Sequence, residues 1–146
     1  ALGYAANVAE DLEAAARQAD IISCATLSRA PLIRGAWLKP GSHLDLIGAF
    51  NKDMRESDDE AVRRARLFVD TRAGAFAEAG DLLQPMAAGV IDADHVVAEL
   101  SELVGGTEGR RSAEDITLFK SVGAALEDLA GAILAYGTAT QNKVSA

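Results

Sequence analysis

The side chains that could perform nucleophilic or metal chemistry are few in this sequence. Cys24 is the one cysteine and lies in the apolar run at residues 21–25, where nothing nearby would stabilise a thiolate, so we predict a buried, inert thiol. A lone cysteine makes neither an intrachain disulfide nor a cysteine zinc cluster. His43 begins a predicted strand, at the end away from bound ligands, and His95 has no neighbouring cysteine or second histidine. We therefore expect no metal site.

Charged residues form a second set of candidates, and each has two interpretations. Asp53, Arg55 and Glu56 either steer a substrate carboxylate or amine, or they start a helix and pair with one another. Lys120 either approaches a ligand or lies on the surface where the last predicted helix starts. The sequence leaves both alternatives open for each group.

Glycines mark one close approach of the backbone and one exposed loop. Gly48 ends a predicted strand, where the lack of a side chain lets the backbone run close to a ligand. Gly105, Gly106 and Gly109 are grouped more closely, but they follow a predicted helix and not a strand. A dinucleotide-binding loop places its glycines between a strand and the N-terminus of a helix. We therefore predict a surface loop at residues 105–111.

Short apolar runs alternate with helical periodicity along the chain. We predict strands at residues 21–25, 43–47, 66–70 and 116–119, with an earlier strand near residues 4–8. We predict helices at residues 11–19, 53–65, 72–83, 94–104 and 121–136 and a fraying tail at 137–146. Ser57 and Glu60 match a capping box, and the helix at 72–83 is expected to break near Gly80 and stop at Pro85. This alternation predicts an α/β fold with a mainly parallel sheet.

Composition narrows the class of partners. The chain has 146 residues, of which 49% are hydrophobic and 5% aromatic, so it can form one domain with an aliphatic core. Its net charge of −8 repels phosphate backbones and anionic lipid, so we expect neither nucleic acid nor a membrane as a partner. No segment has the pattern of a membrane span or a signal peptide, which predicts a cytoplasmic protein.

An ordered set of short motifs runs through most of the chain. The set consists of residues 19–26 (ADIISCAT), 31–33 (PLI), 37–43 (WLKPGSH), 47–50 (IGAF), 53–56 (DMRE), 68–71 (FVDT), 78–82 (EAGDL) and 116–123 (ITLFKSVG), with Glu127 and Asp128 behind them. Together, and in this order, these motifs resemble the ornithine cyclodeaminase/mu-crystallin family.

The resemblance implies a subunit with a Rossmann-like NAD(P)-binding domain and a dimerisation domain that also binds substrate. On that basis we expect residues 1–112 to be a partial Rossmann-like domain without its first strands and Gly-rich loop. Residues 113–146 would form the segment that returns to the dimerisation domain. The Gly-rich loop and the substrate-binding Arg and Lys of the family are expected upstream of residue 1, and the resemblance implies a homodimer.

The resemblance also implies which residues bind the cofactor, NAD or NADP. The expected cofactor-binding residues are Ala25 and Thr26 along the nucleotide, Gly48 and Ala49 near the nicotinamide, and Ser121, Val122 and Gly123 against the nicotinamide ring. These positions agree with the rule that open α/β sheets bind ligands at the carboxyl ends of their strands. The substrate-side candidates are Phe50, Asp53 and Arg55.

Phe50 distinguishes two branches of this family. Ornithine cyclodeaminases carry a catalytic aspartate at this position, and a phenylalanine cannot act as a general base. The pattern Gly-Ala-Phe-x-x-Asp-Met-Arg-Glu is more similar to the family's ketimine reductases, which reduce cyclic imines such as pyrroline-2-carboxylate or piperideine-2-carboxylate. The resemblance therefore implies an NAD(P)H-dependent oxidoreductase in which the cofactor carries the hydride.

Other functions stay open at this point. The chain is alternatively a non-catalytic α/β module that self-associates through the apolar helix at residues 121–136. The full-length form is alternatively an ornithine cyclodeaminase, against which Phe50 argues, or an amino-acid dehydrogenase acting on an amino acid.

Overall fold

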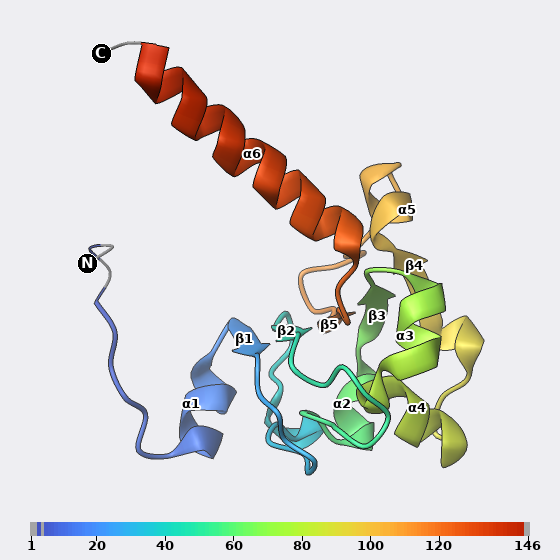
Figure 1. Cartoon of the computed structure of the whole chain (residues 1–146). Coiled ribbons are helices and arrows are strands. Elements are labelled where there is room, and N and C mark those ends of the chain that lie inside the picture. The colour runs from blue at the N-terminus through green and yellow to red at the C-terminus, as the bar shows by residue number, and fades with distance from the viewer. Residues whose placement is uncertain (1–2, 4, 145–146) are drawn as a thin grey trace.

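The computed structural model describes residue 3 and residues 5–144, and its centre is a five-stranded sheet (Figure 1). The strands are β1 (Ile21–Cys24), β2 (His43–Leu46), β3 (Arg66–Val69), β4 (Val96–Glu99) and β5 (Thr117–Lys120). They lie in the order β1-β2-β5-β3-β4, and every neighbouring pair is parallel. This arrangement confirms the predicted α/β class with a parallel sheet.

The helices are short except for the last. They are α1 (Leu12–Gln18), α2 (Asp59–Arg64), α3 (Arg72–Glu78), α4 (Gly80–Ala87), α5 (Leu100–Val104) and α6 (Ala125–Val144), with the 3-10 turns η1 (Gly35–Trp37) and η2 (Ala93–His95). The expected break near Gly80 is confirmed, because α3 ends at Glu78 and α4 begins at Gly80. Pro85 does not stop this segment: it lies inside α4 and is buried.

Side chains at the N-termini explain where three helices begin. Asp11, Asp58 and Thr71 each accept a hydrogen bond from a backbone N–H in the first turn of α1, α2 and α3. The capping box expected at Ser57 and Glu60 is therefore wrong, and the helix expected from residue 53 starts at Asp59. Ser57 is instead buried and faces α4 through Asp81.

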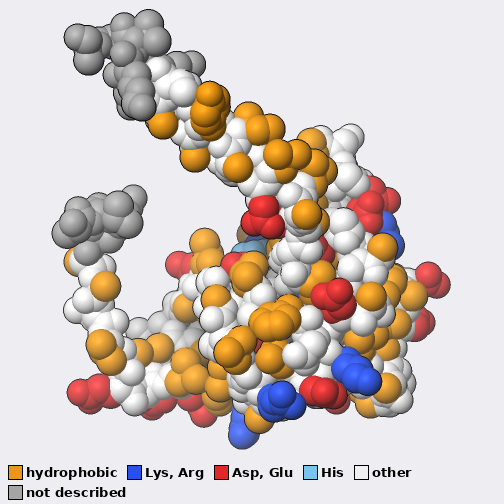
Figure 2. Space-filling view, viewed as in Figure 1, with side chains coloured by type: hydrophobic (Ala, Val, Ile, Leu, Met, Phe, Trp, Pro, Cys, Tyr) orange, Lys and Arg blue, Asp and Glu red, His pale blue; other side chains and the backbone are white. Residues whose placement is uncertain are grey.

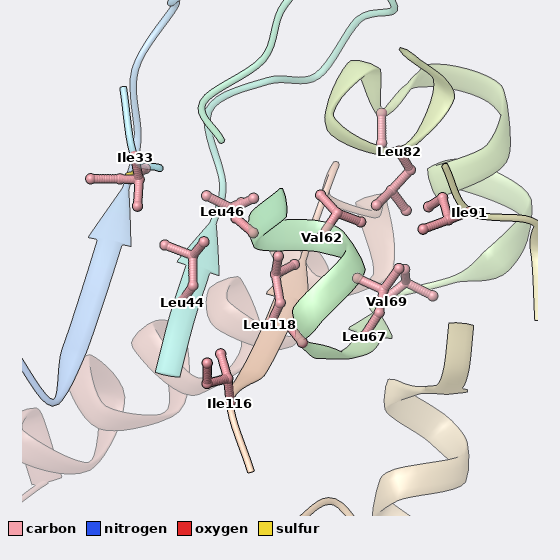
Figure 3. Packing of buried hydrophobic residues seen from close by; sticks show 14 of the residues in the cluster. Ile33, Leu44, Leu46, Val62, Leu67, Val69, Leu82, Ile91, Ile116 and Leu118 are labelled. Atoms are coloured by element: carbon pink, nitrogen blue, oxygen red, sulfur yellow. The ribbon is translucent and has the colours of Figure 1, made fainter. Parts of the chain in front are cut away.

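Aliphatic side chains from the strands and from α2 to α4 form the core on one face of the sheet. Leu44, Leu46, Leu67, Val69 and Leu118 point from β2, β3 and β5 toward Val62 of α2 and Leu82 of α4 (Figure 3). All seven side chains are buried without exposed surface. Because side chains alternate along a strand, the residues between them face the opposite side of the sheet.

The predicted helix at residues 94–104 is wrong in its first half. Residues Ala93–His95 form η2, Val96–Glu99 form β4, and only Leu100–Val104 are α-helical. Val96 and Ala98 are buried while Val97 is exposed, which is the alternation of an edge strand. A short apolar run of this kind fits both periods, and pairing with β3 decides the outcome.

The two ends of the chain also differ from the prediction. Residues 5–9 form no strand, and Tyr4 of the strand expected at 4–8 lies outside the described residues. The tail expected at residues 137–146 is helical as far as Val144, with the last two residues outside the described part. Helix α6 extends away from the sheet and carries exposed apolar side chains between Leu126 and Tyr136 (Figures 1 and 2).

Candidate functional site

The carboxyl ends of four strands form one level edge of the sheet. Cys24 of β1 is paired with Leu46 of β2, which is paired with Lys120 of β5, which is paired with Val69 of β3. Each strand therefore ends at the same height, and the residues that follow lie side by side. Ligands of open α/β sheets bind at such an edge.

Glu56 joins the ends of β1 and β2. Its Oε1 atom accepts hydrogen bonds from the backbone N–H of Thr26, at 2.6 Å, and from the Thr26 hydroxyl, at 2.8 Å. Its Oε2 atom accepts a hydrogen bond from the backbone N–H of Gly48, at 2.9 Å. Glu56 is fully buried, so these bonds are shielded from water. We call this arrangement the Glu56 clamp.

Gly48 is where the two strand ends come closest. A Cβ atom at this position would overlap the backbone N and O of Thr26 and the carboxylate of Glu56. The structure shows a close approach of the chain to itself at Gly48, and the expected approach of a ligand stays a prediction. The missing side chain makes room for another segment of this chain, and this contact brings Thr26 beside Gly48.

Asp70 forms a second carboxylate clamp at the end of β3. Its Oδ2 atom accepts hydrogen bonds from the Ser121 hydroxyl, at 2.9 Å, and from the backbone N–H groups of Val122, at 2.9 Å, and Gly123, at 2.8 Å. Asp70 is buried, with 4% of its surface exposed. We call this arrangement the Asp70 clamp, and it fixes the turn that follows β5.

Gly123 ends this turn in a backbone conformation suited to glycine. Its φ of +86° lies in the left-handed region, where residues with a Cβ are strained. Nothing lies within 4 Å of the position that a Cβ would take. The turn therefore presents backbone to open space at the carboxyl edge of the sheet.

The seven residues expected to bind the cofactor converge at this edge. They are Ala25, Thr26, Gly48, Ala49, Ser121, Val122 and Gly123, from the loops after β1, β2 and β5. Gly48, Ala49 and Ser121 are buried, whereas Ala25 and Gly123 are exposed. Their convergence is a matter of geometry, and their role in binding stays a prediction.

The substrate-side candidates lie in the segment after Gly48. Phe50 is an exposed large apolar side chain, with 47% of its surface accessible. Asp53 is exposed, while Arg55 forms an ion pair with Asp59, at 2.7 Å, and donates to the backbone carbonyl of Ser57. Of the two interpretations of Arg55, substrate steering and a salt bridge near a helix start, the observed contacts match the salt bridge.

The sequence alone did not reveal the two clamps. Glu56 appeared only as one of three charges near a helix start, and Asp70 only as the end of a predicted strand. Thr26 lies 30 residues before Glu56 and Ser121 lies 51 residues after Asp70, so local spacing carries no sign of these contacts. Gly48 is nearer to Glu56, at 8 residues, but nothing in the sequence marks the two as partners. The one available signal is that each carboxylate adjoins a predicted strand end or a motif of the resemblance.

A buried ion pair lies behind the Glu56 clamp. Lys120 Nζ lies 3.6 Å from Asp81 Oδ2, and both side chains are fully buried. Burial raises the pKa of Asp81 and lowers the pKa of Lys120, because both charged forms lose water. Lys120 therefore takes neither position that the sequence left open, a ligand contact or the surface. It is buried inside the protein and pairs with Asp81.

The cysteine and the two histidines considered in the sequence each make contacts within the fold. Burial raises the pKa of the Cys24 thiol to about 12, as expected for an inert cysteine. His43 Nδ1 hydrogen-bonds with Thr117 Oγ1, at 2.8 Å, at the amino ends of β2 and β5, where both residues line a cavity of about 220 Å³. His95 Nε2 contacts the backbone carbonyl of Val62. Within the described part of the chain, no group of three His, Cys, Asp or Glu residues is placed to hold a metal ion.

This fold and its motifs define a known family. The chain belongs to the ornithine cyclodeaminase/mu-crystallin family, whose model matches residues 2–143.

Similar proteins share both sequence and fold with the chain. It is 51% identical over 120 residues to a Δ1-pyrroline-2-carboxylate reductase of Paracoccus denitrificans, covering 82% of this chain and 38% of that protein. It is 38% identical over 137 residues to the ketimine reductase mu-crystallin of Mus musculus, covering 94% of this chain and 41% of that protein. The structure of Thermococcus litoralis Δ1-pyrroline-2-carboxylate reductase in complex with NADH and L-proline is 43% identical, with a TM-score of 0.88 over 92% of this chain and 42% of that one. The sheet is therefore Rossmann-like.

The chain spans about two fifths of the length of these relatives. Among the residues that the structure describes, no helix combines the length and the apolar character needed to cross a membrane.

Proposed function

We propose that this chain forms the nicotinamide side of an NAD(P)H-binding site in a reductase of cyclic imines such as pyrroline-2-carboxylate. The observation that carries the proposal is the pair of carboxylate clamps. They hold the ends of β1, β2 and β5 at one edge of the sheet, where the seven proposed cofactor-binding residues meet. The relatives named as pyrroline-2-carboxylate reductases support the substrate class.

The residues at this edge fit a nicotinamide ring. The turn at Gly123 leaves open space beside backbone, which a flat ring needs in order to lie against it. A reduced nicotinamide, when bound, supplies the hydride for reduction of an imine. The chain's own residues bind and orient the ring, and Phe50 contributes an apolar surface that excludes water. Phe50 cannot transfer a proton, which favours reduction over deamination.

The further parts of the proposal concern the whole protein. We propose that α6 leads to the dimerisation domain and buries its exposed apolar side chains in a homodimer, with the sheet remaining in the nucleotide-binding domain. The apolar side chains in question are Leu126, Leu129, Ile133, Leu134 and Tyr136, all more than half exposed. The domain boundary expected at residue 112 stays a prediction. Strand β5 follows that boundary in the sequence, yet it lies inside the sheet. A cytoplasmic location accords with use of NAD(P)H.

Titration of NADH and NADPH into the chain, followed by nicotinamide fluorescence, tests the proposal. We expect saturable but weak binding, with a dissociation constant of roughly 0.1–1 mM, because the chain supplies only part of the contacts. The substitution Gly123→Val places a side chain in the open space beside the turn and is expected to weaken binding by about tenfold.

Gly89→Val is the matched control. Gly89 also has a left-handed φ, of +70°, with nothing within 4 Å of a Cβ, but it follows α4 in the connection that leads to the amino end of β4. This variant therefore carries the same backbone strain without touching the proposed site, and it should bind like the wild type. Equal losses in the two variants, or no saturable binding by the wild type, would contradict the proposal.

A further inference from the structure

The buried pair of Asp81 and Lys120 adjoins the Glu56 clamp, because Asp81 hydrogen-bonds to the backbone of Glu56. The proposed reaction makes no use of this pair. Neither Asp81 Oδ2 nor Lys120 Nζ makes a hydrogen bond to any described residue, although both atoms are buried. Buried polar atoms without hydrogen bonds are costly, and a buried ion pair often adds little net stability. The hydrogen bonds made by the rest of the Asp81 side chain suggest a different contribution.

Asp81 uses its other oxygen to fix the backbone of Glu56. Its Oδ1 atom accepts hydrogen bonds from the backbone N–H groups of Glu56, at 2.8 Å, and Ser57, at 3.0 Å. The Glu56 side chain in turn accepts from Thr26 and Gly48. A continuous series of hydrogen bonds thus runs from α4 through Glu56 to the ends of β1 and β2.

The other half of the edge is held by a different carboxylate. The turn at Ser121–Gly123 is fixed by Asp70, and none of its hydrogen bonds involves Asp81 or Glu56. Removing the Asp81 acceptor should therefore loosen one half of the edge and leave the other in place. A residue that merely stabilises the fold would affect both halves alike.

We infer that Asp81 is a positioning residue for the Thr26 and Gly48 half of the nucleotide site, and that Lys120 is the counter-charge that keeps its carboxylate in the interior. This inference rests on the proposed NAD(P)H site. Asp81 does not touch the cofactor in this account. It acts through Glu56, which sets where the backbone at the ends of β1 and β2 lies.

Two double variants isolate the hydrogen-bond acceptor. In Asp81→Asn/Lys120→Met the amide oxygen still accepts from Glu56 and Ser57, whereas in Asp81→Ala/Lys120→Met no acceptor remains. Neither variant contains the Asp81–Lys120 charge pair, so they differ in the acceptor and not in that charge. Amide hydrogen exchange, measured by NMR without ligand, reports how readily the hydrogen bond of each backbone N–H group opens.

We expect the Ala double variant to exchange the amides of Thr26 and Gly48 at least about tenfold faster than the Asn double variant. The amides of Val122 and Gly123 should exchange at the same rate in both. A uniform increase at all four amides, or no increase at Thr26 and Gly48, would overturn the inference. If the Ala double variant does not fold, Asp81→Ser/Lys120→Met replaces it, since a serine hydroxyl is too short to reach both N–H groups.

An NADH titration of the same variants separates this inference from the proposed function. The Ala double variant is expected to bind NADH about tenfold more weakly than the Asn double variant, and equal affinities would contradict the positioning role in binding. Failure of the wild type to bind NADH would contradict the proposed function. The exchange comparison would still test Asp81, because it is made without ligand.

Discussion

Cys24 shows how a chemically reactive side chain becomes structural through its surroundings. It is the last residue of β1, with 7% of its surface exposed, and it lies among the core side chains. Burial is the largest cause of its raised pKa, and the nearby carboxylate of Glu56 adds to it because a thiolate would face a like charge. The thiol therefore stays protonated throughout the ordinary pH range.

A raised pKa in the folded state makes stability fall at alkaline pH. The pKa of Cys24 is about 12 in the folded protein against an ordinary value of 9.0, so the unfolded chain loses this proton first. The stabilising contribution is fully present below the ordinary value and is lost as the pH rises toward the folded value. From roughly pH 8 to pH 10, the wild type should lose about 1 kcal/mol of unfolding free energy relative to Cys24→Ala.

Urea denaturation of the two proteins at several pH values measures this difference. Parallel curves of unfolding free energy against pH would show that the thiol ionises equally in both states.

At the residue scale, sequence predicts what depends on local context and misses what depends on distant partners. The inert Cys24 could be predicted because its apolar neighbours are adjacent in the chain. The roles of Glu56 and Asp70 could not, because Thr26 and Ser121 reach them only after the sheet has formed. The burial of Lys120 was missed for the same reason, since its counter-charge Asp81 comes from α4.

At the scale of elements, the loops after β1 and β2 meet through a contact that only glycine allows. Four of the five strands could be predicted from short apolar runs, and β4 was missed because its run also fits a helix. The family resemblance singled out seven residues that meet at the carboxyl edge of the sheet, although the predicted helix at residues 121–136 included three of them that the structure places in a turn before α6. It could not supply the contacts between those loops, which involve backbone atoms of Thr26 and Gly48.

Gly48→Ala tests this contact between elements. The added methyl group would overlap the Thr26 backbone and the Glu56 carboxylate, so the clamp must open or the strand ends must separate. We expect a loss of about 1–3 kcal/mol in the free energy of unfolding, measured by urea denaturation.

Gly131→Ala is the control for the same chemical change. Nothing lies within 4 Å of a Cβ at Gly131, which is inside α6, and alanine favours helix by roughly 0.5–1 kcal/mol. This variant should be as stable as the wild type or slightly more stable. A Gly48→Ala protein with unchanged stability would show that the two loops do not pack as described.

At the scale of the whole molecule, the chain combines a well-packed sheet with a helix whose large apolar side chains stay exposed in the part of the chain that the structure describes. The core on the face covered by α2 to α4 is closed, whereas α6 extends away with its apolar side chains exposed (Figures 1 and 2). The chain spans about two fifths of the length of its relatives. In our account the carboxyl edge of the sheet is one half of a nucleotide site, and α6 belongs to a separate interface.

The most direct test of this account is to map NADH binding on the chain by amide chemical shifts. We predict that the largest changes on adding NADH will fall on Thr26, Gly48, Ala49, Val122 and Gly123, which meet at the carboxyl ends of β1, β2 and β5. Changes concentrated instead around His43 and Thr117, at the amino ends of β2 and β5 beside the cavity, would contradict the account. The absence of any saturable change would contradict it equally.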